Sequence, residues 1–117
     1  MSGTKLAQTV MHLDLQVPEQ HIPEFLIHAR KLYEAVTAEP ECTFFDLSQS
    51  SEDPGFFRGV ESWTTSKEWM AQVQERKPYY QAYVKGTAHM GIKSTITCFE
   101  RIPGWTDTKA SSWTVGK

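Results

Sequence analysis

The sequence predicts an α+β fold in which four antiparallel strands form one sheet and two helices cover one of its faces. Three observations predict it: four stretches alternate with period 2, two longer stretches repeat apolar residues at helical spacing, and their order is strand, helix, strand, strand, helix, strand. That order is the split βαβ, ferredoxin-like βαββαβ pattern. The 117 residues suffice for one such domain, predicted at residues 1–104, and a C-terminal tail at 105–117.

The first half of the chain gives a strand and then a helix. Residues 6–17 alternate, so that the odd-numbered positions from Ala7 to Val17 form a core face and His12 lies on a more polar face. Pro18 ends the strand, and apolar residues then recur at helical spacing to about residue 38. The apolar stripe of this helix predicts that it packs on the sheet.

Two strands joined by a turn follow. Residues 42–49 form the first of them, the segment SSEDPG is a turn by composition, and the second strand continues to a turn that begins at Ser62. In this second strand Glu61 and Trp63 share one face, whereas Arg58 lies on the other. The strand therefore carries charges and large rings toward both sides of the sheet.

A second helical segment and a last strand complete the domain. The helical segment covers residues 66–85, starts with a serine N-cap, and is expected to end or kink at Pro78. Residues 92–102 alternate again and give the fourth strand. The tail is polar apart from residues such as Trp105 and Trp113, so it is either disordered or docks these rings on a partner subunit.

Composition and charge exclude several classes of function. The chain has 14 acidic and 12 basic residues, and the basic ones are scattered, which makes nucleic acid and anionic membranes poor partners. The N-terminal residues 1–17 contain no unbroken apolar run, so we expect neither a signal peptide nor a membrane span. We therefore expect a cytoplasmic location. Cys42 and Cys98 lie far apart outside any metal-binding motif, so we expect no disulfide and no protein-bound metal.

Several residues carry a resemblance to a known family. Glu61, Ser62 and Trp63, followed by Ser66 and then by a Glu-Trp pair, resemble the "E-x-W, short turn, S-x-E-A" segment of the antibiotic biosynthesis monooxygenase domain family. The stretch KPYYQAYVKGTAHM is similar to the version in fungal members, and the resemblance covers roughly residues 6–102. It implies a dimeric α+β barrel, which is a homodimer with a pocket in each subunit between the sheet and the helices.

The resemblance also implies an activity. Family members include cofactor-free oxygenases that convert anthrones and related phenols to quinones, as well as haem-degrading enzymes. A histidine that many bacterial members carry nine residues past the tryptophan is Gln72 here, which argues against haem ligation. We therefore expect a cofactor-independent monooxygenase of aromatic or polyketide secondary metabolism that oxidises an anthrone or phenol-like substrate. The alternatives are an isomerase, decarboxylase or cyclase on a similar substrate, or a non-catalytic small-molecule binding dimer.

The site is predicted from residue chemistry and from the matched motif. A catalytic base is expected at His12 or His89, although His12 also fits a hydrogen-bonded position at the dimer interface. Glu61 is expected only to pair with Arg58 or Arg76. The residues predicted to bind a flat aromatic molecule are Trp63, Trp69, Tyr79, Tyr80, Tyr83, Phe45 and Phe57.

Overall fold

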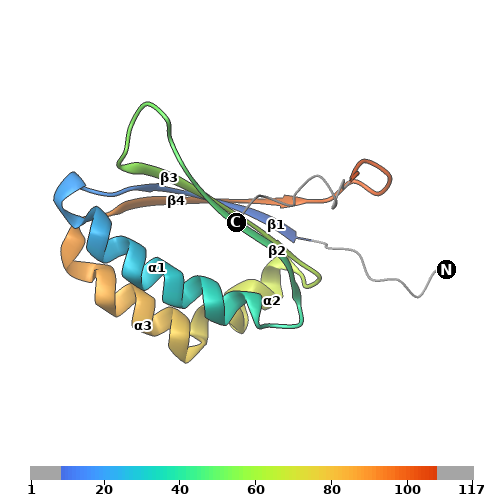
Figure 1. Ribbon diagram of the computed structural model, residues 1–117. Helices are drawn as coiled ribbons and strands as arrows, with labels where there is room; N and C mark the ends of the chain where they lie inside the picture. Colours follow the sequence, from blue (N-terminus) through green and yellow to red (C-terminus); the bar gives the residue numbers. More distant parts are fainter. Residues whose placement is uncertain (1–8, 108–117) are drawn as a thin grey trace.

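The computed structural model describes residues 9–107 as two layers, an antiparallel sheet and a layer of helices on one of its faces (Figure 1). The sheet has the order β2-β3-β1-β4. Its strands are β1 (Thr9–Gln16), β2 (Cys42–Gln49), β3 (Phe56–Trp63) and β4 (Lys93–Glu100). The helices are α1 (Ile22–Thr37), α2 (Lys67–Gln72) and α3 (Pro78–Thr87). The predicted ferredoxin-like α+β fold is therefore confirmed.

The pairing register fixes which residues share a face of the sheet. Met11 lies opposite Glu61 of β3, and Leu13 lies opposite Gly59 of β3 and Ile96 of β4. Because side chains alternate along a strand, these residues point toward the helices. Their neighbours in sequence point to the other side, which we call the open face; it carries His12, Asp14, Phe44, Arg58, Val60 and Phe99.

The second helical segment is not one helix but two. Ser66 caps α2, since its hydroxyl accepts a hydrogen bond of 3.1 Å from the backbone N–H of Trp69. A short 3₁₀ turn, η2 (Gln74–Arg76), follows α2, and Lys77 is then extended, as a residue before proline prefers. Pro78 begins α3 as its first residue, where the missing N–H costs nothing. The helical segment is therefore interrupted at Pro78, as predicted, and a new helix begins there.

The core has two parts along the sheet. One part gathers Leu15, Val17, Phe25, Phe57 and Met90, and the other gathers Met11, Val36, Trp63 and Met70. Within residues 9–107 no helix combines the length and apolar character that a membrane crossing requires. Of the two tail tryptophans, Trp105 is 83% exposed, and Trp113 lies outside the described residues.

Candidate functional site

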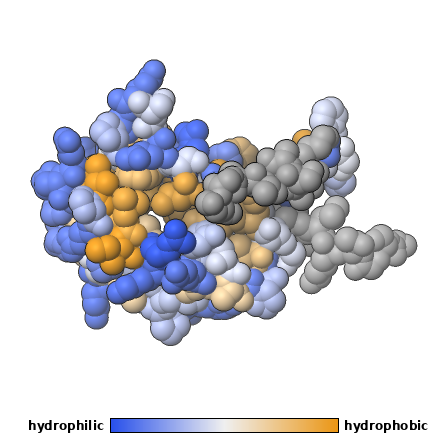
Figure 2. All heavy atoms as spheres, viewed as in Figure 1, coloured by the Kyte–Doolittle hydropathy of each residue, from blue (hydrophilic) through white to orange (hydrophobic). Residues whose placement is uncertain are grey.

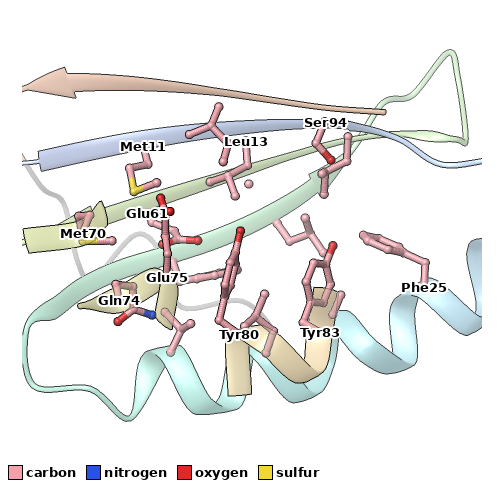
Figure 3. Close-up of a pocket in the computed structure, with 18 residues that line it drawn as sticks. Met11, Leu13, Phe25, Glu61, Met70, Gln74, Glu75, Tyr80, Tyr83 and Ser94 are labelled. Carbon is pink, nitrogen blue, oxygen red and sulfur yellow. The ribbon is translucent and has the colours of Figure 1, made fainter. Parts of the chain in front are cut away.

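A cavity of about 110 Å³ lies between the two layers (Figure 3). Its wall on the sheet side comes from all four strands, and its wall on the helix side comes from α1, α2, η2 and α3. The lining residues are Met11, Leu13, Leu15, Phe25, Ala29, Leu32, Val36, Phe45, Leu47, Gly59, Glu61, Met70, Gln74, Glu75, Tyr80, Tyr83, Ser94 and Ile96.

Most of this lining is apolar, and the cavity reaches the surface beside β4. Ser94 and Ile96 of β4 both line it and are exposed, Ile96 to 45%. Apolar side chains show between the sheet and the helices on the face seen in Figure 2. An apolar hollow with a few polar groups is the usual form of a small-molecule site.

Glu61 brings a carboxyl group into this apolar wall. The strand period places it on the helix side of β3, where its residue is only 7% exposed. The indole N–H of Trp63 donates a 2.8 Å hydrogen bond to Glu61 Oε1. Burial raises the pKa of Glu61, and the bond from Trp63 partly offsets that rise. The result is a carboxyl group whose basicity exceeds that of an exposed glutamate.

The ion pair predicted for Glu61, with Arg58 or Arg76, does not form among the described residues. Arg58 lies on the open face, where its guanidinium donates to both carboxylate oxygens of Asp14, at 2.6 and 3.1 Å. Side chains alternate between the two faces along a strand, and Arg58 and Glu61 lie three positions apart, so they point to opposite faces and cannot meet across the sheet.

Two tyrosines of α3 stand opposite Glu61. Tyr80 and Tyr83 point from the helix toward the sheet (Figure 3), with ring centroids 6.4 Å apart and planes 27° apart. Burial raises the pKa of Tyr83 to about 12, and burial together with the charges of Glu75 and Glu61 raises the pKa of Tyr80. Both phenols are therefore neutral hydrogen-bond donors at physiological pH.

Gln74 adds a buried amide whose orientation is fixed by its neighbours. The hydroxyl of Tyr79 donates to Glu39 at 2.8 Å, and Lys77 donates to the same carboxylate oxygen at 2.6 Å. Because the single proton of Tyr79 is used there, the amide nitrogen of Gln74 must be the group that donates to Tyr79, at 2.7 Å. Gln74 Oε1 is then a buried acceptor with no partner among the described residues.

The structure brings only part of the predicted site together. Phe45, Tyr80 and Tyr83 line the cavity. Trp63 is fully buried and supports the wall through Glu61 instead of lining it. Trp69 packs on Trp63 at 6.1 Å with Lys77 above its ring, Tyr79 belongs to the Glu39 network, and Phe57 packs on Phe25 in the core.

The two predicted bases lie away from the cavity. His12 is on the open face, 5.0 Å from the ring of Phe99, so the sheet separates it from the cavity. His89 lies in η3 (Ala88–Met90) after α3, more than half exposed and 3.1 Å from the carboxylate of Glu24. Neither histidine lines the cavity, which leaves Glu61 as its buried base.

Sequence reasoning passed over Glu61, Gln74 and Glu75. A signal for Glu61 existed, because a glutamate two residues before a buried tryptophan shares the covered face of its strand. Among residues 9–107 the cavity wall contains no histidine and no cysteine, so a metal or haem would find only carboxylate, amide, hydroxyl and phenol groups there. Gln72, at the position of the bacterial histidine, is exposed at the end of α2.

Comparisons with known proteins point in one direction. The family model described as antibiotic biosynthesis monooxygenase matches residues 9–86. A proposed monooxygenase of Pestalotiopsis microspora is 36% identical over 105 residues, which cover 89% of this chain and 88% of that protein. A solved antibiotic biosynthesis monooxygenase has a TM-score of 0.70 at 22% identity, over 81% of this chain and 99% of that one.

A further solved structure carries the same fold. A protein of Deinococcus radiodurans, proposed to be an antibiotic biosynthesis monooxygenase, superimposes with a TM-score of 0.75 at 18% identity. The superposition covers 86% of this chain and 98% of that one. At this identity the likeness concerns the fold alone.

Proposed function

This chain belongs to the antibiotic biosynthesis monooxygenase family, and on that premise we propose that it oxidises a small phenol-like aromatic compound with dioxygen inside the cavity. The observation that supports this most is Glu61, a carboxyl group 7% exposed in a mostly apolar wall. Burying a carboxyl group without a cation costs stability, and such costs concentrate at functional sites. Glu61 is the proton acceptor of the proposed reaction.

The cavity volume limits which part of the substrate enters. An apolar cavity of about 150 Å³ takes up benzene, so a volume of about 110 Å³ corresponds to roughly one aromatic ring. In the proposal the phenolic ring that reacts enters the cavity, and any further rings of a naphthol or anthrone extend toward the opening beside β4. Polyketides and other secondary metabolites supply compounds of this shape.

The polar groups of the cavity orient that ring. Phenol hydroxyls of Tyr80 and Tyr83 donate to a carbonyl or phenolate oxygen, and Gln74 Oε1 accepts from a substrate hydroxyl. Glu61 removes the proton from the acidic C–H or O–H of the substrate. Burial raises the pKa of Glu61 toward neutral pH, and a base transfers protons most effectively when its pKa is near the operating pH.

The reaction balances with dioxygen as the only oxidant. For a methylene between two aryl rings, R₂CH₂ + O₂ gives R₂C=O + H₂O. The carbanion left by proton removal passes one electron to dioxygen, and the radical pair joins to form a C–O bond. The proton from Glu61 completes a hydroperoxide, and loss of the second C–H proton with cleavage of the O–O bond releases water. The substrate supplies all the electrons, so this route uses no bound flavin or metal.

Oxygen uptake tests this proposal. Purified protein, free of flavin and treated with a chelator, is given hydroquinones, naphthols and anthrones, and uptake above the autoxidation rate is expected. A variant that fills the cavity is Gly59→Val. Gly59 lines the cavity, and a Cβ atom added there would meet its nearest neighbours only at 3.8 Å. This variant is expected to fold and to lose both uptake and binding. Full turnover in Gly59→Val would place the reaction elsewhere.

The same assay separates the alternative function. Isomerisation, decarboxylation and cyclisation also begin with proton removal, so Glu61 favours them equally. Substrate consumed without oxygen uptake, and in a Glu61-dependent way, indicates a non-oxidative enzyme. Quenching of tryptophan fluorescence with no turnover indicates a binding protein.

We extend the proposal to a homodimer assembled through the open face. This face exposes Phe99 to 49% and leaves the apolar side chains of Val10, Phe44 and Val60 partly exposed, with no helix covering them among the described residues. A second copy covers it with the same residues. Light scattering is expected to give twice the chain mass, and Val60→Lys to reduce it to one chain. Val84→Lys, at a 45% exposed position of α3, is the control that stays dimeric.

A further inference from the structure

Three side chains outside the cavity converge at one end of the helical layer. The imidazole Nε2 of His89 lies 3.1 Å from the carboxylate of Glu24, and His21 Nδ1 lies 3.8 Å from Glu24 Oε1. The two imidazole rings meet edge to face with centroids 5.6 Å apart. One ligand atom of each of the three residues falls within 4.8 Å of the other two.

The backbone that carries these side chains is well defined. His21 ends η1 (Glu19–His21) and is the N-cap of α1, and Glu24 lies in the first turn of that helix. His89 lies in η3, which Gly91 ends with a left-handed φ of 72° that suits glycine. Since α1 and α3 run side by side (Figure 1), residues 65 positions apart meet here.

We infer that His21, Glu24 and His89 bind a divalent transition-metal ion, Zn²⁺ being the most suitable. Bonds of about 2.0–2.2 Å in tetrahedral geometry put ligand atoms roughly 3.3–3.5 Å apart. The His89–Glu24 separation of 3.1 Å is already close to this, and the His21–Glu24 separation of 3.8 Å needs only a small side-chain rotation.

The chemistry of the donors selects the metal. Two imidazole nitrogens and one carboxylate suit zinc, copper, nickel and cobalt, whereas magnesium and calcium prefer oxygen ligands alone. The carboxylate supplies one negative charge, and the side chains remain open to water, with exposed fractions of 27% for His21, 45% for Glu24 and 54% for His89. Water completes the coordination.

A plain ion pair explains only part of this arrangement. His89 and Glu24 are at hydrogen-bonding distance, but the 3.8 Å between His21 and Glu24 is too long for a hydrogen bond. Both rings nevertheless converge on the same carboxylate. The terminal segments 1–8 and 108–117 contain no histidine, cysteine or acidic residue, so no stronger site of these ligand types resides in them.

A metal ion here would connect the start of α1 to the end of α3. These two helices carry Phe25, Ala29, Tyr80 and Tyr83, which line the cavity. The ion therefore holds together the two helices of the cavity wall without touching the cavity. Because the proposal concerns the helix ends alone, it stands whether or not the cavity catalyses an oxidation.

Calorimetric titration of the full chain, without a polyhistidine tag, tests the proposal. We expect one Zn²⁺ per chain, no binding of Mg²⁺, and a rise of the melting temperature of about 5 °C at saturating Zn²⁺. His89→Gln and Glu24→Gln are each expected to weaken Zn²⁺ binding by about tenfold or more and to abolish the thermal shift. His12→Gln, which removes a histidine from the open face, is the matched control and binds Zn²⁺ like the wild type.

Circular dichroism of each variant establishes that it is folded before titration. A triple variant combines His21→Gln, Glu24→Gln and His89→Gln. If this variant is folded and binds Zn²⁺ with wild-type affinity, the proposal is overturned, because Zn²⁺ then binds elsewhere. An equal loss of affinity in His12→Gln would overturn it too. Selective loss in the two single variants His89→Gln and Glu24→Gln supports it.

Discussion

Two carboxylates on opposite faces of the same sheet behave in opposite ways. Asp14 on the open face accepts two hydrogen bonds from Arg58, and these bonds lower its pKa. Glu61 on the covered face is 7% exposed and accepts a bond from the neutral indole of Trp63, and burial raises its pKa. On the open face the carboxylate of Asp14 is paired with a guanidinium, whereas on the covered face the carboxyl group of Glu61 has no cationic partner among the described residues.

The difference indicates which face of the sheet carries a reactive carboxyl group. An ion pair at an exposed position, such as Asp14–Arg58, contributes little to the free energy of unfolding, as surface ion pairs generally do. An unpaired buried carboxyl group lowers stability, and Trp63 holds it in one orientation. A costly and oriented group of this kind beside a cavity is what a proton-transfer site requires.

The largest expected effect contrasts these two carboxylates directly. Glu61→Gln keeps the shape and the acceptor oxygen for Trp63 but cannot take a proton. Oxygen uptake per enzyme is therefore expected to fall by about 10²–10⁴-fold, the usual contribution of a general base. Asp14→Asn, the matched change on the open face, is expected to alter turnover by less than about twofold.

Initial rates of oxygen uptake across a substrate series check this prediction. A fall of comparable size in Asp14→Asn would show that the open face, and with it His12, takes part in the reaction. Retained turnover in Glu61→Gln would remove the proposed base.

Local patterns predicted most of the fold. The strand at residues 42–49 was predicted with the bounds of β2, because alternation and the proline before it are local signals. The N-cap at Ser66 and the interruption at Pro78 were also predicted, because serine capping and the restriction before proline are local signals. What the pattern did not give is that α2 already ends at Gln72 and that a separate helix begins at Pro78.

The site was less accessible to sequence because its pairings are long-range. Which charge meets which depends on strand register, and Arg58 finds its partner 44 residues away in β1. The helical phase after Pro78 turns Tyr80 and Tyr83 to the cavity and Tyr79 to Glu39, and a pattern without a fixed helix start cannot give that phase. The contact between Glu24 and His89 spans 65 residues and was equally hidden.

A smaller effect sharpens the role of Trp63. Trp63→Phe retains a buried ring but loses the N–H that donates to Glu61. That hydrogen bond lowers the pKa of Glu61, so its loss is expected to raise this pKa further and to shift the acidic limb of kcat/KM to higher pH. At mildly acidic pH we expect a loss of about tenfold, which shrinks as pH rises.

The control for this variant is Trp69→Phe, at the ring that packs 6.1 Å from Trp63. It changes the same cluster without removing a bond to Glu61, so its pH profile is expected to match the wild type. A uniform loss of activity at every pH in Trp63→Phe would mean that the tryptophan acts only through packing.

The smallest expected effect is on stability, and its sign differs between the two faces. The folded pKa of Glu61 lies above its ordinary value of 4.5, so its favourable contribution is complete below that pH and is lost as pH rises through the folded pKa. The folded pKa of Asp14 lies below its ordinary value of 3.8, so its contribution is present above that pH and is lost as pH falls.

Glu61→Gln should therefore gain melting temperature relative to the wild type as pH rises, and Asp14→Asn should lose a little at neutral pH and nothing in acid. Melting curves at several pH values between about 3 and 9 measure both differences. Parallel curves for wild type and Glu61→Gln would mean that Glu61 is as well solvated when folded as when unfolded, and the contrast between the faces would then disappear.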